Sequence, residues 1–194
     1  EARTEPQQQP EACGRCHARR GIIAPEYEYG APLAHTHLPA LLDEGLYFAD
    51  GQILDEVYVY GSFLQSRMYA AGVTCTDCHE PHSLKLRAEG NGVCATCHFP
   101  SRYDTPAHHH HPEDSQSSAC TACHMPQRNY MVIDARADHS LRVPRPDLSE
   151  ALGTPNACTA CHSHKTAAWA AEVLELLKMN EGNNSGRGIG CVSW

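Results

Sequence analysis

Five copies of one short pattern, Cys-x-x-Cys-His, contain ten of the eleven cysteines of this 194-residue chain. The copies are Cys13/Cys16/His17, Cys75/Cys78/His79, Cys94/Cys97/His98, Cys120/Cys123/His124 and Cys158/Cys161/His162. On one helical turn, residues i, i+3 and i+4 share a face, so two thiols and an imidazole point toward the same object. Thiols at this spacing bond the two vinyl groups of a porphyrin, and the following imidazole reaches its iron. The pattern is the attachment signature of c-type haem, and it predicts five c-type haems as cofactors.

Two other uses of cysteine fit the pattern less well. The pairs Cys75/Cys78 and Cys94/Cys97 are separated by fifteen residues, which also suits a zinc site of four thiolates. Such a site has no use for a histidine after the second cysteine, whereas all five motifs have one. Disulfide pairing does not explain that histidine either, nor the fourteen histidines of the chain. Haem attachment is therefore the favoured interpretation.

Each iron has one ligand from its own motif and needs, or leaves open, a second. Nine further histidines are available: His35, His37, His82, His108, His109, His110, His111, His139 and His164. Since five would saturate every iron, the count does not require an open catalytic iron. Low-spin electron transfer is the simplest interpretation, and we predict no catalytic residue.

Five of these histidines are the expected second ligands. His82 follows His79 by three residues, too close to fold back across the same ring, so we assign it to a neighbouring haem. His37 and His139 lie in longer connections near proline. In the run 108–111, His108 and His111 are three apart and can point along one side.

Other interpretations of these residues remain open. His37 and His139 also fit surface or hydrogen-bonding histidines, and the run 108–111 also fits a solvated stretch or an adventitious metal site. The reserve ligands are His35, His109, His110, His164 and Met68, the last of which also suits ordinary apolar packing.

The composition predicts a thin side-chain core. Hydrophobic residues make up 41% of the chain, but aromatic residues only 7%, with three Phe. At about 39 residues per haem, the porphyrins must form most of the interior and lie close together. The expected fold class is a multihaem cytochrome c: mostly irregular coil, with a few short α-helices wrapped around a stack of five haems and little or no β-sheet.

Local patterns predict few regular elements. We expect an extended arm over 1–12, a short helix over 38–46 that starts at Pro39, a strand or extended segment over 53–60 and a helix over 62–71. Regular structure should be scarce between 74 and 124. The one long helix expected is 166–179, with Trp169 and Leu176 on one face, lying over the last cofactor.

Charge and hydropathy limit the partners. A net charge of −8 disfavours nucleic acid, whose phosphates require clustered Lys and Arg. No apolar run approaches the roughly 18 to 20 residues that cross a bilayer, so no membrane span is expected. The first residue, Glu1, suits a mature chain whose export signal has been removed.

Several strings resemble known multihaem cytochromes. GVTCTDCH (72–79), CHEPH (78–82), CHMP (123–126) and DHSLRVPRP (138–146) resemble the c-type cytochromes that include cytochrome c nitrite reductase and its relatives. DGQILDEVYVYGSFLQSRMYAAGVTCTDCH (50–79) and GTPNACTACH (153–162) resemble more closely the multihaem cytochromes fused to tetratricopeptide repeats. The resemblance implies stacked and perpendicular haem pairs, and it supports His82 as the ligand of a neighbouring haem. Nitrite reductase resemblance implies a catalytic haem with a Cys-x-x-Cys-Lys motif, which this sequence does not contain, and residues 180–194 after the expected last helix do not resemble a tetratricopeptide repeat.

The prediction is a five-haem electron-transfer protein, exported to the periplasm or the cell exterior. A single domain covers 1–180, and a Gly- and Asn-rich tail, 181–194, is held by a neighbouring subunit. Similar cytochromes polymerise into extracellular filaments, and a homo-oligomer or filament that passes electrons to redox proteins or an extracellular acceptor is expected here. Cys191, the cysteine outside the five motifs, fits such an assembly, and it also fits a free thiol or an intermolecular disulfide. The alternatives are a monomeric periplasmic shuttle, a subunit of a redox complex, and a reductase of nitrogen or sulfur oxyanions with one open haem.

Overall fold

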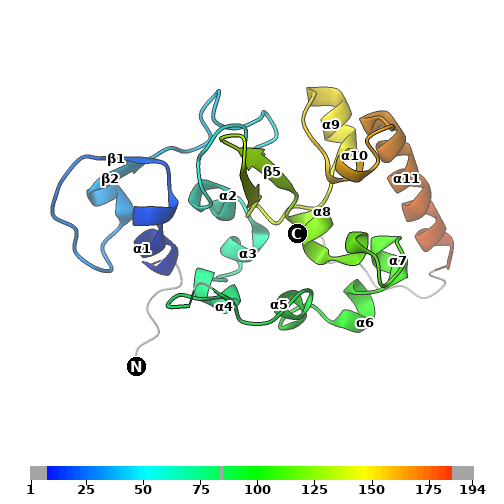
Figure 1. Cartoon of the computed structure of the whole chain (residues 1–194), viewed down its shortest axis with the longest axis horizontal. Helices are drawn as coiled ribbons and strands as arrows, with labels where there is room; N and C mark the ends of the chain where they lie inside the picture. Colours follow the sequence, from blue (N-terminus) through cyan, green and yellow to red (C-terminus); the bar gives the residue numbers. More distant parts are fainter. Residues whose placement is uncertain (1–7, 84, 185–194) are drawn as a thin grey trace. The chain divides into compact units, whose positions relative to one another are not determined.

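Short helices and strand pairs joined by long irregular segments make up the computed structural model of this chain, which describes residues 8–83 and 85–184 (Figure 1). Contacts between Cα atoms divide the chain into two compact units, with the boundary between Pro144 and Arg145. None of the helices in the described ranges is long and apolar enough to cross a membrane.

The first unit contains many short helices. They are α1 (Gln8–His17), η1 (Leu33–His35), α2 (Tyr60–Leu64), α3 (Arg67–Ala70), α4 (Cys75–Cys78), α5 (Gly92–Ala95), α6 (Pro100–Tyr103), α7 (Pro106–His109), η2 (Gln116–Ser118) and α8 (Cys120–His124). Proline occupies the first turn of α6 and α7, where its missing N–H has no helical partner to lose. Asp77 closes the start of α4, because its carboxylate accepts from the backbone N–H and the hydroxyl of Thr74 at 2.7 and 3.0 Å.

Three antiparallel strand pairs complete the first unit. They are β1 (Arg20–Ile22) with β2 (His37–Pro39), β3 (His79–Glu80) with β4 (Lys85–Leu86), and β5 (Gln127–Tyr130) with β6 (Asp134–Ala137). The expected irregular chain with short helices is therefore observed, and these small strand pairs are added to it.

Few apolar side chains are buried. In the described residues the buried hydrophobic set is Ala18, Leu33, Tyr47, Ile53, Val57, Tyr60, Tyr130 and Ala170. Seven of them form two separate clusters, Tyr47/Ile53/Val57/Tyr130 and Ala18/Leu33/Tyr60. This matches the thin core expected from composition.

Regular structure is not scarce between 74 and 124 as expected, because α4 to α8, η2 and the pair β3/β4 lie there. Three further local predictions were wrong in part. Residues 8–12 belong to α1 rather than to an extended arm. No helix forms over 38–46, because Leu38 and Pro39 pair with β1 and the chain then turns at Gly45, whose φ is +83°. The segment 53–60 forms isolated bridges instead of a strand, since Tyr58 has a φ of +62°.

The helix expected over 62–71 is present as two pieces. α2 ends at Leu64, and Ser66 starts α3 by accepting a hydrogen bond from the N–H of Tyr69 at 3.0 Å.

The second unit consists of α9 (Pro146–Leu152), α10 (Ala157–Cys161) and α11 (Ala167–Asn184). Gly153 ends α9 with a φ of +69°, and the side chain of Asn156 accepts from the N–H of Thr159 at the start of α10. α11 confirms the long helix expected at 166–179 and packs against α9 and α10. It includes the first residues of the tail 181–194; Cys191 lies outside the described residues.

Candidate haem-attachment sites

Every motif lies on one turn of backbone, at or beside a short helix. Motif one forms the last turn of α1, and motif four forms the whole of α8. The two cysteines of motif two begin and end α4, and its histidine follows directly. In motifs three and five the histidine N–H donates to the carbonyl of the first cysteine, Cys94 or Cys158, at 2.9 Å. The single turn of backbone thus keeps the three residues of a motif close together, as thioether attachment requires.

No disulfide involves any of the ten motif cysteines, all of which the structure describes. Cys16, Cys97 and Cys161 are exposed, and the other seven are half-buried. Residues 8–83 and 85–184 contain no cluster of three or more His, Cys, Asp or Glu side chains that could hold a bare metal ion. Two thiols followed by an imidazole, repeated five times, are the donor set that thioether attachment and iron ligation of haem require.

Motifs one and two are in direct contact. The Cys75 thiol lowers the pKa of the Cys13 thiol to about 7, and the Cys13 thiol together with burial raises the pKa of Cys75. Gln9 supports this contact, because its side chain donates to the Thr76 hydroxyl and accepts from the Thr76 N–H, both at 2.9 Å. These thiols stand where the thioether sulfurs of two haems would be.

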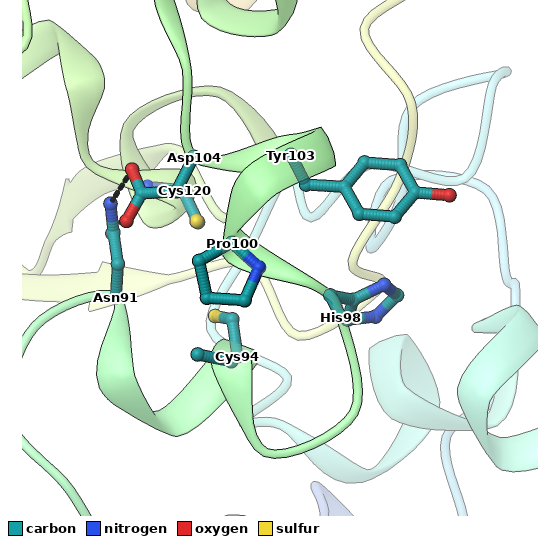
Figure 2. A pocket seen from close by; sticks show the side chains of 8 residues that line it. Asn91, Cys94, His98, Pro100, Tyr103, Asp104 and Cys120 are labelled. Atoms are coloured by element: carbon teal, nitrogen blue, oxygen red, sulfur yellow. Dashed lines mark hydrogen bonds between the residues drawn. The ribbon is translucent and has the colours of Figure 1, made fainter.

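Motifs three and four repeat this arrangement. The sulfurs of Cys94 and Cys120 face the same small hollow, which is also lined by His98, Pro100 and Tyr103 (Figure 2). Burial and the nearby Cys120 sulfur raise the pKa of Cys94 to about 11.

Cys123 is the cysteine of motif four that does not line this hollow. The sequence predicts that the sulfurs of Cys120 and Cys123 point toward the same group. In the described residues, Cys120 is the only cysteine of motif four that lines the hollow. The physical reason is position, because the hollow meets the start of α8, whereas Cys123 is half-buried three residues further along that helix. The hollow is therefore not the site of haem four as a whole, and the attachment of that haem to Cys123 stays a prediction.

Asn91 joins the backbones of motifs three and four. Its Oδ1 accepts from the N–H of Cys120 at 2.8 Å, and its Nδ2 donates to Asp104 at 2.8 Å and to the Ser118 carbonyl at 3.1 Å. Two motif pairs are therefore each held by one amide side chain, Gln9 or Asn91.

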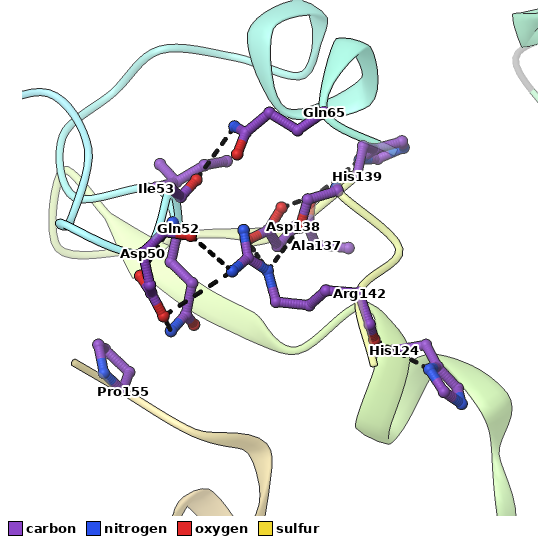
Figure 3. A network of polar contacts seen from close by, with 12 residues as sticks. Asp50, Gln52, Ile53, Gln65, His124, Ala137, Asp138, His139, Arg142 and Pro155 are labelled. Atoms are coloured by element: carbon purple, nitrogen blue, oxygen red, sulfur yellow. Dashed lines mark hydrogen bonds and ion pairs between the residues drawn. The ribbon is translucent and has the colours of Figure 1, made fainter. Parts of the chain in front are cut away.

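A polar network surrounds the segment that follows β6 (Figure 3). Arg142 donates to the hydroxyl of Ser140 at 2.8 Å and to the carbonyl of Asp50 at 3.0 Å. Its guanidinium also lies 3.8 Å from the Asp50 carboxylate and 4.0 Å from that of Asp138. Since both carboxylates are nearly buried, this cation fixes the path of residues 138–142.

That segment orients two histidines from the sequence prediction. His139 donates from Nδ1 to the carbonyl of Ala137 at 3.0 Å, and the motif histidine His124 donates from Nδ1 to the carbonyl of Arg142 at 2.9 Å (Figure 3). A hydrogen bond of this kind fixes the tautomer and leaves Nε2 available to a metal.

The other expected second ligands have varied surroundings. His37 is buried with Nδ1 2.8 Å from the Thr36 hydroxyl, and burial together with Arg20 and Arg15 lowers its pKa. His82 is almost fully exposed beside Glu80. Nδ1 of His111 is hydrogen-bonded to the backbone carbonyl of His109. The role of each as a ligand stays a prediction.

In the second unit the fifth motif meets the long helix. The ring of Trp169, in the first turn of α11, lies 5.2 Å from that of His162, and Lys165 lies over the same indole. The reserve ligand His164 is exposed, with its ring 6.5 Å from His162.

Sequence reasoning missed the residues that hold the motifs in place, namely Gln9, Asn91 and Arg142. Asn91 precedes the helix of motif three, which is a cap position, but Gln9 and Arg142 act over 67 and 92 residues of sequence. No local signal marks them.

Comparisons with known proteins agree with this architecture. No family model matches the chain. The structure is similar to the crystal structure of the outer cell wall cytochrome OcwA, with a TM-score of 0.66 and 18% identity over 86% of this chain and 51% of that one. A stretch of 25 residues is 80% identical to part of the Fe-coproporphyrin III synthase of Methanosarcina barkeri. The match covers 13% of this chain and 6% of that protein, which is too short to indicate a family. The chain spans about half the length of OcwA and shares the fold of a cytochrome.

Proposed function

We propose that this chain is an electron-transfer multihaem c-type cytochrome with five covalently attached haems. The observation that carries the proposal is the set of five Cys-x-x-Cys-His turns, with no cysteine of theirs in a disulfide, on a cytochrome fold. The ten motif cysteines attach the haems, and His17, His79, His98, His124 and His162 are the proximal ligands.

The contacts between motifs support electron transfer as the role. When bound, haem supplies an iron that gains or loses one electron, and closely spaced haems pass that electron on. The Cys13–Cys75 contact and the Cys94–Cys120 hollow bring attachment points of different haems together. Gln9 and Asn91 hold these spacings fixed, so the chain acts as a frame for the haems.

Haem content and reversible redox chemistry test this proposal. The chain is expressed in a bacterial periplasm together with c-type haem attachment enzymes. We expect an intact mass increased by five haems, low-spin absorption bands and reversible one-electron titrations. A colourless product, or a mass equal to that of the bare polypeptide, would overturn the proposal.

The reductase alternative predicts an iron with an open position. Carbon monoxide binding to the fully reduced native protein would reveal it, whereas a protein with five saturated irons shows no binding. Reduction of nitrite or sulfite would have to accompany carbon monoxide binding for the enzyme interpretation to replace the carrier.

Export and assembly are further parts of the proposal. Haem attachment of this type takes place outside the cytoplasm, and the structural neighbour is named as an outer cell wall protein.

We expect filaments or smaller homo-oligomers on negative-stain grids and early elution in size-exclusion chromatography. Elution at monomer mass, with no assemblies on the grids, would favour the periplasmic shuttle.

A further inference from the structure

Two pairs of histidines, whose members are separated in the sequence, have nearly parallel ring planes and nearly the same distance between ring centres. The ring centres of His79 and His139 are 6.3 Å apart with planes 25° apart. Those of His124 and His108 are 6.2 Å apart with planes 14° apart. One member of each pair is a motif histidine and the other comes from a connecting segment.

This separation suits a shared metal. A metal–imidazole bond is about 2 Å long, so two imidazoles bound through Nε2 on opposite sides of one ion have ring centres roughly 6 Å apart. The ring-centre distances of 6.3 and 6.2 Å in the two pairs match this arrangement.

The hydrogen bonds leave the required nitrogen available. Since a backbone carbonyl only accepts, Nδ1 of His139 carries the proton that it donates to Ala137, and Nδ1 of His124 carries the one donated to Arg142. Nε2 of each ring is then the unprotonated nitrogen that binds metals. One histidine of each pair thus has the tautomer that a metal ligand requires.

We infer that His79 and His139 are the two axial ligands of one haem iron, and that His124 and His108 are the two axial ligands of another. The inference rests on the proposed function and deepens it by assigning the second ligand of haems two and four. Tyr103 lies between the two adjoining sites, with its ring 5.5 Å from His98 and 5.3 Å from His108, both edge-on. It therefore separates the ligands of haems three and four.

Single substitutions of the second ligands test the assignment. In the five-haem protein we expect His139→Ala and His108→Ala each to keep five haems by mass but to gain one high-spin haem per chain, which binds carbon monoxide when reduced. Added imidazole should restore the low-spin spectrum, an effect that a merely structural role would not produce. His139→Met should keep one replacement ligand and raise one midpoint potential.

The matched control is Ala107→Ser, beside His108 on the same helix and without a metal-binding side chain, which should keep the low-spin spectrum of the parent. Loss of haem from the parent protein would overturn the proposed function. Five haems with an unchanged spectrum in His139→Ala and His108→Ala would overturn only the ligand assignment.

A further variant tests which haem His139 serves. Cys75→Ala/Cys78→Ala removes haem two, so adding His139→Ala should produce no new high-spin haem. A new high-spin signal would show that His139 serves a different iron. If the four-haem protein fails to fold, a structure of the five-haem protein decides the pairing, and His139 bound to any iron other than that of His79 contradicts it.

Discussion

Gly14 stands between the two cysteines of the first motif, a position that the motif itself leaves open. It is buried, and a Cβ placed there would lie 2.9 Å from Leu33 Cδ2 and 2.9 Å from Tyr60 Cδ2. Both neighbours belong to the cluster Ala18/Leu33/Tyr60. At this site the requirement is for space, so that α1 can approach the core closely.

Substitution of Gly14 by valine should therefore overpack this cluster. We expect a loss of about 1–3 kcal/mol in the free energy of unfolding, measured by denaturant titration of the holoprotein. The control is Gly21→Ala, because a Cβ at Gly21 meets nothing within 4 Å. An equal effect of both changes would argue against the close packing described for α1.

At the scale of elements, Asn91 connects the start of α5 with the start of α8. Asn91→Ala leaves the N–H of Cys120 without its 2.8 Å acceptor, which should cost about 1–3 kcal/mol. Hydrogen exchange at the Cys120 amide should accelerate more than at amides of α11. Asn91→Asp keeps the acceptor and should slow this exchange again; if both variants exchange alike, the hydrogen bond to Cys120 is not the important contact.

Arg142 fixes the segment that leads out of β6. Arg142→Gln removes the cation beside the nearly buried Asp138 and Asp50, with an expected loss of about 1–3 kcal/mol after allowance for partial exposure. Because Arg142 fixes the stretch that contains His139 and its carbonyl accepts from His124, potentiometry should show shifts in two midpoint potentials as well. Arg142→Lys should recover part of both effects, whereas unchanged potentials would separate this residue from the haem site.

The elements differ in how far the sequence predicts them. The five motif turns depend on local spacing, and the sequence predicts all of them together with α11. The helix expected over 38–46 fails because the Arg19 carbonyl and β1 take up the backbone groups of residues 38–40. The positions of Gln9 and Arg142 depend on contacts between distant segments, which local patterns do not contain.

At the scale of the whole molecule, the two buried clusters of the first unit are too small to stabilise it alone. A chain made without haem attachment should lack a cooperative unfolding transition and be digested rapidly by protease. Circular dichroism during thermal unfolding compares the two forms. A sharp transition in the haem-free chain would show that the side chains alone suffice.

Alkaline pH should weaken the larger cluster. Burial raises the pKa values of Tyr47 and Tyr130 to about 12, against about 10 in the unfolded chain. The folded state therefore favours the protonated phenols, and this stability is complete below about pH 10 and is lost as the pH rises toward about 12. Unfolding midpoints across this range should fall more steeply in the parent than in Tyr47→Phe/Tyr130→Phe. The exposed Tyr29→Phe is the control, and equal slopes would contradict the assignment.

The short stretch from Ala137 to Arg142 contains His139 of one histidine pair, and its last backbone carbonyl accepts a hydrogen bond from His124 of the other. A shift of this stretch would alter both environments at once. With the proposed ligands, a substitution in this stretch would therefore change two reduction potentials together. A substitution at the other member of a pair, His79 or His108, would change only one.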